Sequence, residues 1–358
     1  MPTVLITGLN GFVAVHTAVI FLSNGWSVRG TVRSKEKAEK VKSLPVLKEY
    51  VDQGKVELVI LEDLIEGDFS EALKGVDGVA HCASPWHFNG KKWEDYREPA
   101  VKGTTRIIEQ AADVPSVKSI AVVSSFASIG DFSKPATEQA GRVYTEEDWC
   151  PNTDEFAANF KGDAAPQIWY VTSKKLAEEA AFATEKKIGN KHSLGTVCPP
   201  CDLTLAQHPM VILGPAIHCA EGDDLSKADV STSMLYSFFA AGKDAKLEPT
   251  DFPLWGDVRN VAQALFEIVT KHANGRFAIC NGAFAPQALA NRARELYPDL
   301  AKAGIIPVGE PDNTPSKDGA FKLDGSKAER ELGIKYTTVD EMIKDTIEQM
   351  KKIGAIKA

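Results

Sequence analysis

The sequence predicts an α/β fold, a doubly wound parallel sheet with helices on both faces, followed by a smaller, mostly helical unit. Two observations carry this prediction. Short apolar runs rich in β-branched residues alternate with helical periodicity through the first half of the chain. A glycine turn also separates the first of these runs, residues 3–7, from the first helical segment, residues 12–22. After Pro215 the alternation weakens and helical patterns dominate.

The turn Gly8-Leu-Asn-Gly11 follows a buried strand and opens a helix. Gly8 permits a tight turn, and Gly11 lets the backbone approach a ligand closely. The first amides of the helix would then face an anion such as a diphosphate. Ala14 stands where the dinucleotide-binding fingerprint prefers a third glycine, and it adds only a methyl group. The turn therefore predicts a dinucleotide site, and the alternative is a strand-to-helix turn without a ligand.

The second strand, residues 26–32, ends in the basic segment Arg33-Ser-Lys-Glu-Lys37. The adenosine ribose lies at this position in a Rossmann-type sheet. An acidic residue there would repel a 2′-phosphate, whereas Arg33, with Lys37 one turn further on, would pair with it. The predicted cofactor is therefore NADP(H). The alternative is a solvated basic helix start, which lysine and arginine runs usually are.

Further strands are expected at 56–61, 78–82 and 119–124, with helices at 69–73 and 93–112. Ligands of such sheets gather beyond the carboxyl ends of the strands. Residues just past these ends are therefore expected to form one site. Asp63 and Leu64 would lie near the adenine, and Ala83 and Ser84 would lie against the nicotinamide ribose.

The segment Tyr170-Val-Thr-Ser-Lys174 places a phenol and an ammonium one helical turn apart on the same face. One hydroxyl of Ser124-Ser125 can hydrogen-bond a carbonyl oxygen, while Tyr170 donates its proton to the developing alkoxide. A free tyrosine titrates near pH ~10, and Lys174 would favour the phenolate and hold the ribose hydroxyls. An isolated pair of this kind is usually an ordinary surface helix. Here the pair follows the nucleotide turn and the two serines in the chain, and this order favours a catalytic role.

Together these motifs resemble the extended short-chain dehydrogenase/reductase family, in the branch of the dihydroflavonol reductases and NADPH-dependent carbonyl reductases of the methylglyoxal type. The residues that carry the resemblance extend over roughly three quarters of the chain. They are Thr7-Gly8-Leu-Asn-Gly11-Phe12-Val13, Arg33 with Lys37, His81-Cys-Ala-Ser-Pro85, Ser124-Ser125, Glu147-Asp-Trp149, Tyr170-Val-Thr-Ser-Lys174-Lys175, Pro209-Met-Val-Ile-Leu-Gly214-Pro215 and Asp257-Val-Arg-Asn-Val-Ala262.

The resemblance implies that Ser125 is the catalytic serine, Tyr170 the proton donor and Lys174 its partner. It also implies that the backbone of Ile212 meets the nicotinamide carboxamide and that Ser233 is a phosphate-side hydroxyl. The cofactor contacts expected in total are Thr7, Gly8, Asn10, Gly11, Phe12, Val13, Arg33, Lys37, Asp63, Leu64, Ala83, Ser84, Tyr170, Lys174, Pro209, Ile212 and Ser233.

Four aromatic residues follow strand ends near the expected nicotinamide and could line an apolar pocket for an aryl or alkyl carbonyl compound, although aromatic residues are more often core. They are Trp86, Phe88, Phe126 and Phe132. The histidines show no metal-ligand spacing, and no metal is expected. Cys198-Pro-Pro-Cys201 is interpreted as part of a long connection, 188–201, with the next strand at 202–206.

The chain of 358 residues, 44% hydrophobic and 25% charged, has the composition of a soluble globular protein. A formal net charge of −8 argues against a nucleic-acid surface. The first apolar run, residues 4–7, is too short for a signal peptide or a membrane span, so a cytoplasmic location is expected. The expected partner is a small carbonyl substrate, and the chain would be a monomer or homodimer.

We expect an NADP-binding Rossmann domain at 1–208 plus about 251–281, and a substrate-binding cap at 209–250 and 282–358. Helices are predicted at 231–241, 258–271, 286–296, 326–332 and 339–352, with a strand at 276–279. The segment Asp257-Val-Arg-Asn260 is interpreted as structural.

The function predicted from these features is that of an oxidoreductase, an NADPH-dependent reductase that transfers hydride to the carbonyl carbon of aldehydes or ketones. Three alternatives stay open. An NAD(P)-dependent sugar epimerase of the same fold is opposed by Arg33, and a non-catalytic NADP-sensing regulator is opposed by the Tyr170–Lys174 pair. A dihydroflavonol- or cinnamoyl-type biosynthetic reductase differs only in its pocket.

Overall fold

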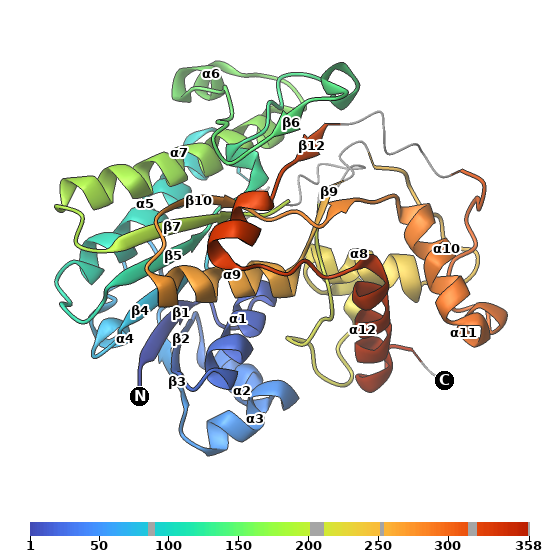
Figure 1. Cartoon of the computed structure of the whole chain (residues 1–358), viewed down its shortest axis with the longest axis horizontal. Coiled ribbons are helices and arrows are strands. Elements are labelled where there is room, and N and C mark those ends of the chain that lie inside the picture. The colour runs from blue at the N-terminus through green and yellow to red at the C-terminus, as the bar shows by residue number, and fades with distance from the viewer. Residues whose placement is uncertain (85–89, 201–210, 251–253, 314–320, 357–358) are drawn as a thin grey trace.

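The computed structural model describes residues 1–84, 90–200, 211–250, 254–313 and 321–356 (Figure 1). Its main feature is a seven-stranded parallel sheet in the order β10-β7-β5-β4-β1-β2-β3. This confirms the predicted doubly wound α/β fold. The strands are β1 Thr3–Thr7, β2 Ser27–Val32, β3 Val56–Ile60, β4 Gly78–His81, β5 Ser119–Val123, β7 Ser193–Cys198 and β10 Gly275–Ala278.

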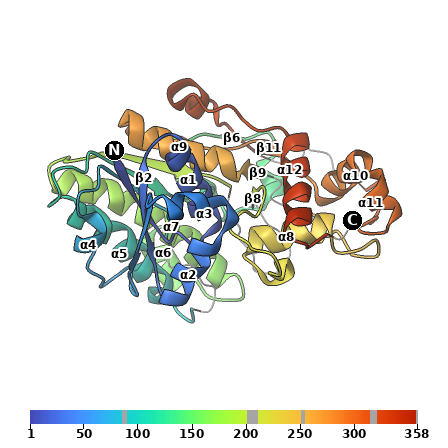
Figure 2. The same cartoon turned by 90° about the horizontal axis from the view of Figure 1, so that it is seen from below.

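Helices cover both faces of this sheet (Figures 1 and 2). One face carries α1 (Phe12–Ser23) and α9 (Val258–Lys271), and the other carries α4 (Ser70–Leu73), α5 (Glu94–Ala111) and α7 (Ala165–Lys187). Side chains of a strand alternate between the two faces. Within β1, Val4 and Ile6 therefore belong to the core under α1 and α9, whereas Leu5 belongs to the core under α4 and α5.

The chain changes direction in the sheet beside β1. It runs from β1 outward to β2 and β3 by way of α1, α2 (Lys35–Ser43) and α3 (Pro45–Asp52), and then returns to β4 on the other side of β1. The connections after β1 and β4 therefore diverge and leave a crevice at the carboxyl ends of these strands.

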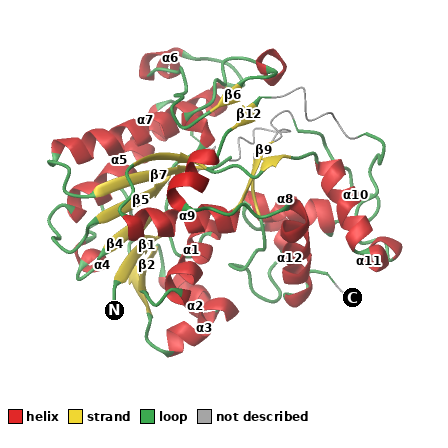
Figure 3. Cartoon of the chain, viewed as in Figure 1, coloured by secondary structure: helices red, strands yellow, loops and turns green. Residues whose placement is uncertain are grey.

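A smaller unit stands beside the sheet (Figure 3). It contains a three-stranded sheet in the order β11-β9-β8 and a core of its own. Its elements are β8 Val211–Leu213, η3 Leu225–Lys227, α8 Val230–Phe239, β9 Leu254–Asp257, β11 Gly282–Ala283, α10 Pro286–Leu296, α11 Pro298–Lys302 and α12 Val339–Lys352. Within the predicted segment 251–281, β9 pairs in this small sheet, whereas α9 and β10 join the large one.

Short elements complete the described chain. A two-stranded sheet of β6 and β12 lies near α6 (Figure 3). The elements are η1 Phe126–Ser128, η2 Ala136–Gln139, β6 Val143–Tyr144, α6 Asp154–Asn159, β12 Lys322–Leu323 and the π-helical segment η5 Ala328–Leu332.

One strand of the large sheet differs from the sequence prediction. The strand after α7 is β7, Ser193–Cys198, inside the stretch that we interpreted as a long connection. The predicted strand at 202–206 lies outside the described residues. Gly195 is required where β7 passes under α9, because an added Cβ would lie 2.6 Å from Ile268. The sequence of β7, Ser-Leu-Gly-Thr-Val-Cys, contains small and polar residues and therefore lacks the continuous apolar run that predicts a buried strand.

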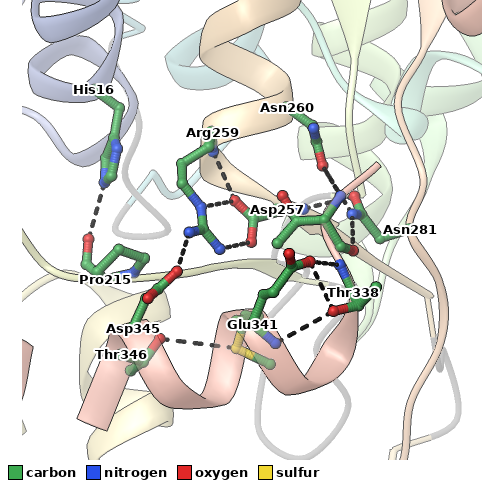
Figure 4. A network of polar contacts seen from close by, with 12 residues as sticks. His16, Pro215, Asp257, Arg259, Asn260, Asn281, Thr338, Glu341, Asp345 and Thr346 are labelled. Carbon is green, nitrogen blue, oxygen red and sulfur yellow. Dashed lines mark hydrogen bonds and ion pairs between the residues drawn. The ribbon is translucent and has the colours of Figure 1, made fainter. Parts of the chain in front are cut away.

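The start of α9 joins the two units (Figure 4). Asp257 accepts hydrogen bonds from Nε and Nη2 of Arg259, both at 2.8 Å, and Arg259 also pairs with Asp345 of α12. The side-chain oxygen of Asn260 accepts from the Asn281 amide at 2.8 Å and from the Thr337 backbone N–H at 3.0 Å. The segment has the structural role expected from the sequence.

Candidate active site

The turn after β1 is built around Gly8, whose φ of +67° lies in the left-handed region. Its N–H donates to Oγ1 of Thr31 at 3.1 Å, and the N–H of Gly11 donates to the Gly8 carbonyl at 2.9 Å. A Cβ added to Gly8 would lie 3.1 Å from the Cβ of Ala83, just past β4. The turn is therefore pressed against the end of β4, and only glycine fits there without strain.

Helix α1 begins directly at this turn. Gly11 is its N-cap, and among the described residues no side chain caps the helix, whose first turn has no acidic residue. The first amides of a helix lack partners within the helix, and its dipole is positive at this end. The start of α1 therefore suits an anionic group such as a diphosphate.

A cavity of about 370 Å³ opens at the crevice between β1, β2 and β4. It brings together many of the predicted cofactor residues, which come from separate strand ends. Its lining is Gly8, Asn10, Gly11, Thr31, Val32, Arg33, Leu61, Glu62, Asp63, Leu64, Ile65, Cys82, Ala83 and Ser84.

The cavity is lined by one basic residue, Arg33, and by two carboxylates, Glu62 and Asp63. Arg33 and Lys37 are exposed beyond β2, and Ser34 caps α2 by accepting from the Lys37 N–H at 3.3 Å. Asp63 accepts from the backbone N–H of Ile65 at 2.6 Å, which orients its carboxylate. The donors and acceptors here fit a phosphorylated adenosine.

Buried polar residues hold the end of β4 against β1. Oγ1 of Thr7 accepts from the N–H of Ala83 at 3.0 Å and lies 3.0 Å from Nδ1 of His81. Burial, together with the nearby charge of Lys174, lowers the pKa of His81 to about 4. His81 is therefore neutral near pH 7, and its Nδ1 shares a hydrogen bond with the Thr7 hydroxyl. Thr7, predicted to contact the cofactor, has a buried side chain that positions Ala83.

The predicted catalytic residues come from β5, η1 and α7. Tyr170 is 8% exposed, and Lys174, one turn later, donates from Nζ to the carbonyl of Val123 at 3.4 Å. Helix α7 packs on η1, whose N-cap Ser125 accepts from the Ala127 N–H at 2.8 Å. Ser125 and Lys174 therefore lie at the carboxyl end of β5, and Tyr170 lies one turn before Lys174 on α7.

The two adjacent serines have different partners. The hydroxyl of Ser124 donates to Oε2 of Glu178 at 2.7 Å. Glu178 also pairs with Arg276 of β10, whose Nε lies 3.0 Å from Oε1, and it accepts from Thr196 of β7. Burial alone would raise the pKa of Glu178, but Arg276 outweighs this effect and lowers it. Sequence reasoning missed Glu178, although it stands one turn after Lys174.

The remaining predicted residues are placed as follows. Ile212 lies half-buried on β8, and the hydroxyl of Ser233 on α8 donates to the Val230 carbonyl at 3.0 Å. Phe126, predicted to line the pocket, is fully buried and stacks on Phe321 at 5.4 Å, so this prediction is corrected to a core role. Phe132 contacts the edge of Phe126. Trp86, Phe88 and Pro209 lie outside the described residues.

The described residues contain no group of three or more potential metal ligands. None of the helices described is both long and apolar enough to cross a membrane. Cys198 ends β7, and burial raises the pKa of its thiol to about 12, so that it stays protonated near pH 7. Cys201 lies outside the described residues.

Comparison with known proteins finds relatives that match nearly the whole chain. The profile of the NAD dependent epimerase/dehydratase family matches residues 4–149. An uncharacterized oxidoreductase of Schizosaccharomyces pombe is 34% identical over 97% of this chain and 96% of its own length. The NADPH-dependent methylglyoxal reductase Gre2 of Saccharomyces cerevisiae is 29% identical over 98% of both chains. The structure of Candida albicans Gre2 in complex with NADPH has a TM-score of 0.81, with 27% identity over 99% of this chain and 100% of that one.

The parallel sheet, the glycine turn and the oxidoreductase relatives define the class of dinucleotide-binding oxidoreductases. Within this class, the chain belongs to the extended short-chain dehydrogenase/reductase family.

Proposed function

We propose that the protein is an NADPH-dependent reductase that converts aldehydes or ketones into alcohols. The observation that carries this proposal is the position of Tyr170 and Lys174 on α7. Lys174 donates to the Val123 carbonyl at the end of β5, α7 packs on η1, which Ser125 caps, and the charge of Lys174 reaches His81 at the neighbouring strand end. The names of the Gre2 relatives support the same reaction class.

NADPH is the cofactor that the residues fit. The uncapped start of α1 would hold the diphosphate, and the exposed Arg33 and Lys37 would hold the 2′-phosphate. Asp63 and Leu64 would face the adenine, and Ala83 and Ser84 the nicotinamide ribose. When bound, the reduced dinucleotide supplies the hydride.

Residues of the chain would donate the proton to the carbonyl oxygen and stabilise the negative charge that develops. Ser125 binds the carbonyl oxygen, and Tyr170 gives its phenolic proton to that oxygen as negative charge develops. The ammonium of Lys174 stabilises the resulting phenolate. Because Ser124 is held by Glu178 at 2.7 Å, we assign the substrate contact to Ser125. Trp86, Phe88 and Phe132 remain the proposed wall of an apolar substrate pocket.

The test is turnover of a panel of aldehydes and ketones with NADPH and with NADH. The Tyr170→Phe variant should lose about 10²- to 10⁴-fold in kcat, because its general acid is gone. Its affinity for NADPH, measured by fluorescence titration, should change little. Tyr50→Phe on α3, a tyrosine that is not among the residues of the proposed site, serves as the matched control and should keep full turnover.

Unchanged turnover by Tyr170→Phe would refute the acid role. Wild-type protein that binds NADPH but reduces no carbonyl compound would instead favour the NADP-sensing alternative. An NAD-dependent epimerase would call for an acidic residue after β2, where Arg33 stands.

A further inference from the structure

A segment of the smaller unit contacts both α1 and α2, the helices that follow the glycine turn and Arg33. This crossing segment, residues 215–229, runs from the end of β8 to the N-cap of α8. The Nε2 atom of His16 on α1 lies 2.9 Å from the Pro215 carbonyl (Figure 4), and Lys40 on α2 pairs with Asp223 at 2.7 Å. Helix α1 opens with the proposed diphosphate turn, and α2 directly follows Arg33. The crossing segment therefore contacts the two helices that begin at the proposed cofactor site.

His218 lies in the middle of this segment and contacts the first residue of α1. Its ring centroid is 5.2 Å from that of Phe12, which directly follows Gly11. Nε2 of His218 lies 2.7 Å from a carboxylate oxygen of Asp229, which also caps α8. Burial alone would lower the pKa of His218, but the bond to Asp229 outweighs it and raises the pKa to about 9. His218 is therefore an imidazolium near pH 7.

His16, the neighbouring histidine on α1, is uncharged near pH 7. Burial lowers the pKa of His16 to about 3, and the charges of His218 and Arg259 act in the same direction. His16 therefore donates one neutral hydrogen bond to Pro215, and His218 carries the positive charge. The other titratable groups that interact with His218 are Cys219 on the segment itself and Asp223, which Lys40 neutralises.

Two buried polar atoms beside Asp229 have no hydrogen-bond partner in the structure as described. They are Nδ1 of His218, whose residue is 8% exposed, and Oγ1 of Thr232, whose residue is fully buried. An imidazolium has two N–H donors, and Asp229 accepts only one of them. A buried charged donor without an acceptor is costly. A ligand with a hydrogen-bond acceptor would satisfy the Nδ1–H donor of His218.

We propose that His218 is a cationic contact for the diphosphate of the bound dinucleotide, supplied by the crossing segment opposite the start of α1. Its Nδ1–H would donate to a phosphate oxygen, and Thr232 would offer a hydroxyl beside it. This inference rests on the proposed function, because it names a further residue for the same cofactor. It also gives the smaller unit a direct role in holding the dinucleotide.

The test compares two ligands by titration calorimetry. NADPH carries the diphosphate, whereas adenosine 2′-monophosphate carries only the group proposed for Arg33 and Lys37. The His218→Gln variant keeps an N–H donor toward Asp229 but loses the charge. We expect it to bind NADPH at least about tenfold more weakly and to bind adenosine 2′-monophosphate within about twofold of wild type. His272→Asn, at the exposed end of α9, should leave both affinities unchanged.

A pH series adds a second readout. Wild-type affinity for NADPH should fall as the pH rises through about 9, where His218 loses its proton, and His218→Gln should lack this step. Unchanged NADPH affinity in the variant overturns the proposal and means that water satisfies Nδ1. Parallel loss of both ligands also overturns it, because His218 would then act through folding. Wild-type protein that binds neither ligand refutes the proposed cofactor itself.

Discussion

Arg33 is the side chain on which cofactor choice depends. It is exposed at the rim of the cavity just past β2 and lies where the adenosine ribose of a bound dinucleotide is expected. No hydrogen bond or ion pair joins its side chain to another of the described residues, which leaves the guanidinium available to a ligand phosphate. A substitution there therefore tests recognition of the cofactor with little effect on the core.

Replacing Arg33 with Asp should reverse the preference between the cofactors. A charge-assisted hydrogen bond contributes about 1.5–3 kcal/mol, so the ratio of kcat/KM for NADPH to that for NADH should fall by about 10- to 100-fold. Steady-state kinetics with both cofactors measure this ratio. Lys102→Asp on α5 changes the net charge equally and should leave the ratio unmoved. A ratio that stays constant in Arg33→Asp would rule out the 2′-phosphate contact.

At the scale of the element, α7 does more than carry Tyr170 and Lys174. Tyr170, Lys174 and Glu178 are spaced four residues apart, so they lie along one stripe of the helix. Glu178 and Arg276 form a buried ion pair that also holds Ser124. The guanidinium of Arg276 reaches the carbonyls of Glu146 and Asp148 and stacks on Trp149 at 3.6 Å. This network fixes the helix against β5, β7 and β10.

The Glu178→Gln variant should be strongly destabilised, because it leaves the Arg276 charge buried without its partner. Removal of one member of a buried pair typically costs about 3–5 kcal/mol. Denaturant unfolding measures the loss. Glu179→Gln, on the next residue of α7, removes a half-exposed partner of Lys175 and should cost less than about 1 kcal/mol. Equal losses in the two variants would show that the network does not anchor α7.

At the scale of the whole molecule, neutral histidines lie where the parts of the fold meet. His16 joins α1 to the crossing segment, and His81 joins the ends of β1 and β4. Burial is the main cause of their low pKa values, about 3 for His16 and about 4 for His81. An unfolded chain would protonate both near pH 6.5. Stability is therefore linked to pH through these two residues.

The free energy of unfolding should fall as the pH drops below 6.5. Between about pH 4 and 6.5 the unfolded chain binds two protons that the folded chain excludes, and each contributes about 1.4 kcal/mol for each pH unit. His218 has the opposite sign, and its contribution is fully present below pH 6.5 and lost as the pH rises through about 9. Denaturant unfolding at pH 7, 6 and 5 should show the loss, and His16→Gln should reduce its slope. A flat profile from pH 6.5 to 5 would contradict this account.

The sequence by itself determined the features that depend on neighbouring residues. The bounds of α9, α10 and α12 were predicted correctly, because helical periodicity is local. Three motifs could also be recognised in the sequence: the glycine turn, the basic end of β2 and the four-residue spacing of Tyr170 and Lys174. The parallel direction of the strands, with helices on both faces of the sheet, followed from the alternation of strands and helices, because parallel strands need crossover connections.

Only the tertiary structure decided the features made by distant segments. Glu178 and Arg276 are 98 positions apart, and Lys40 and Asp223 are 183 positions apart. No local pattern marks such pairs, so the role of Ser124, the core position of Phe126 and the charge of His218 could not be read from the chain. Burial and the proximity of charge decide whether a histidine is neutral, like His16, or charged, like His218, and both arise only when the chain folds.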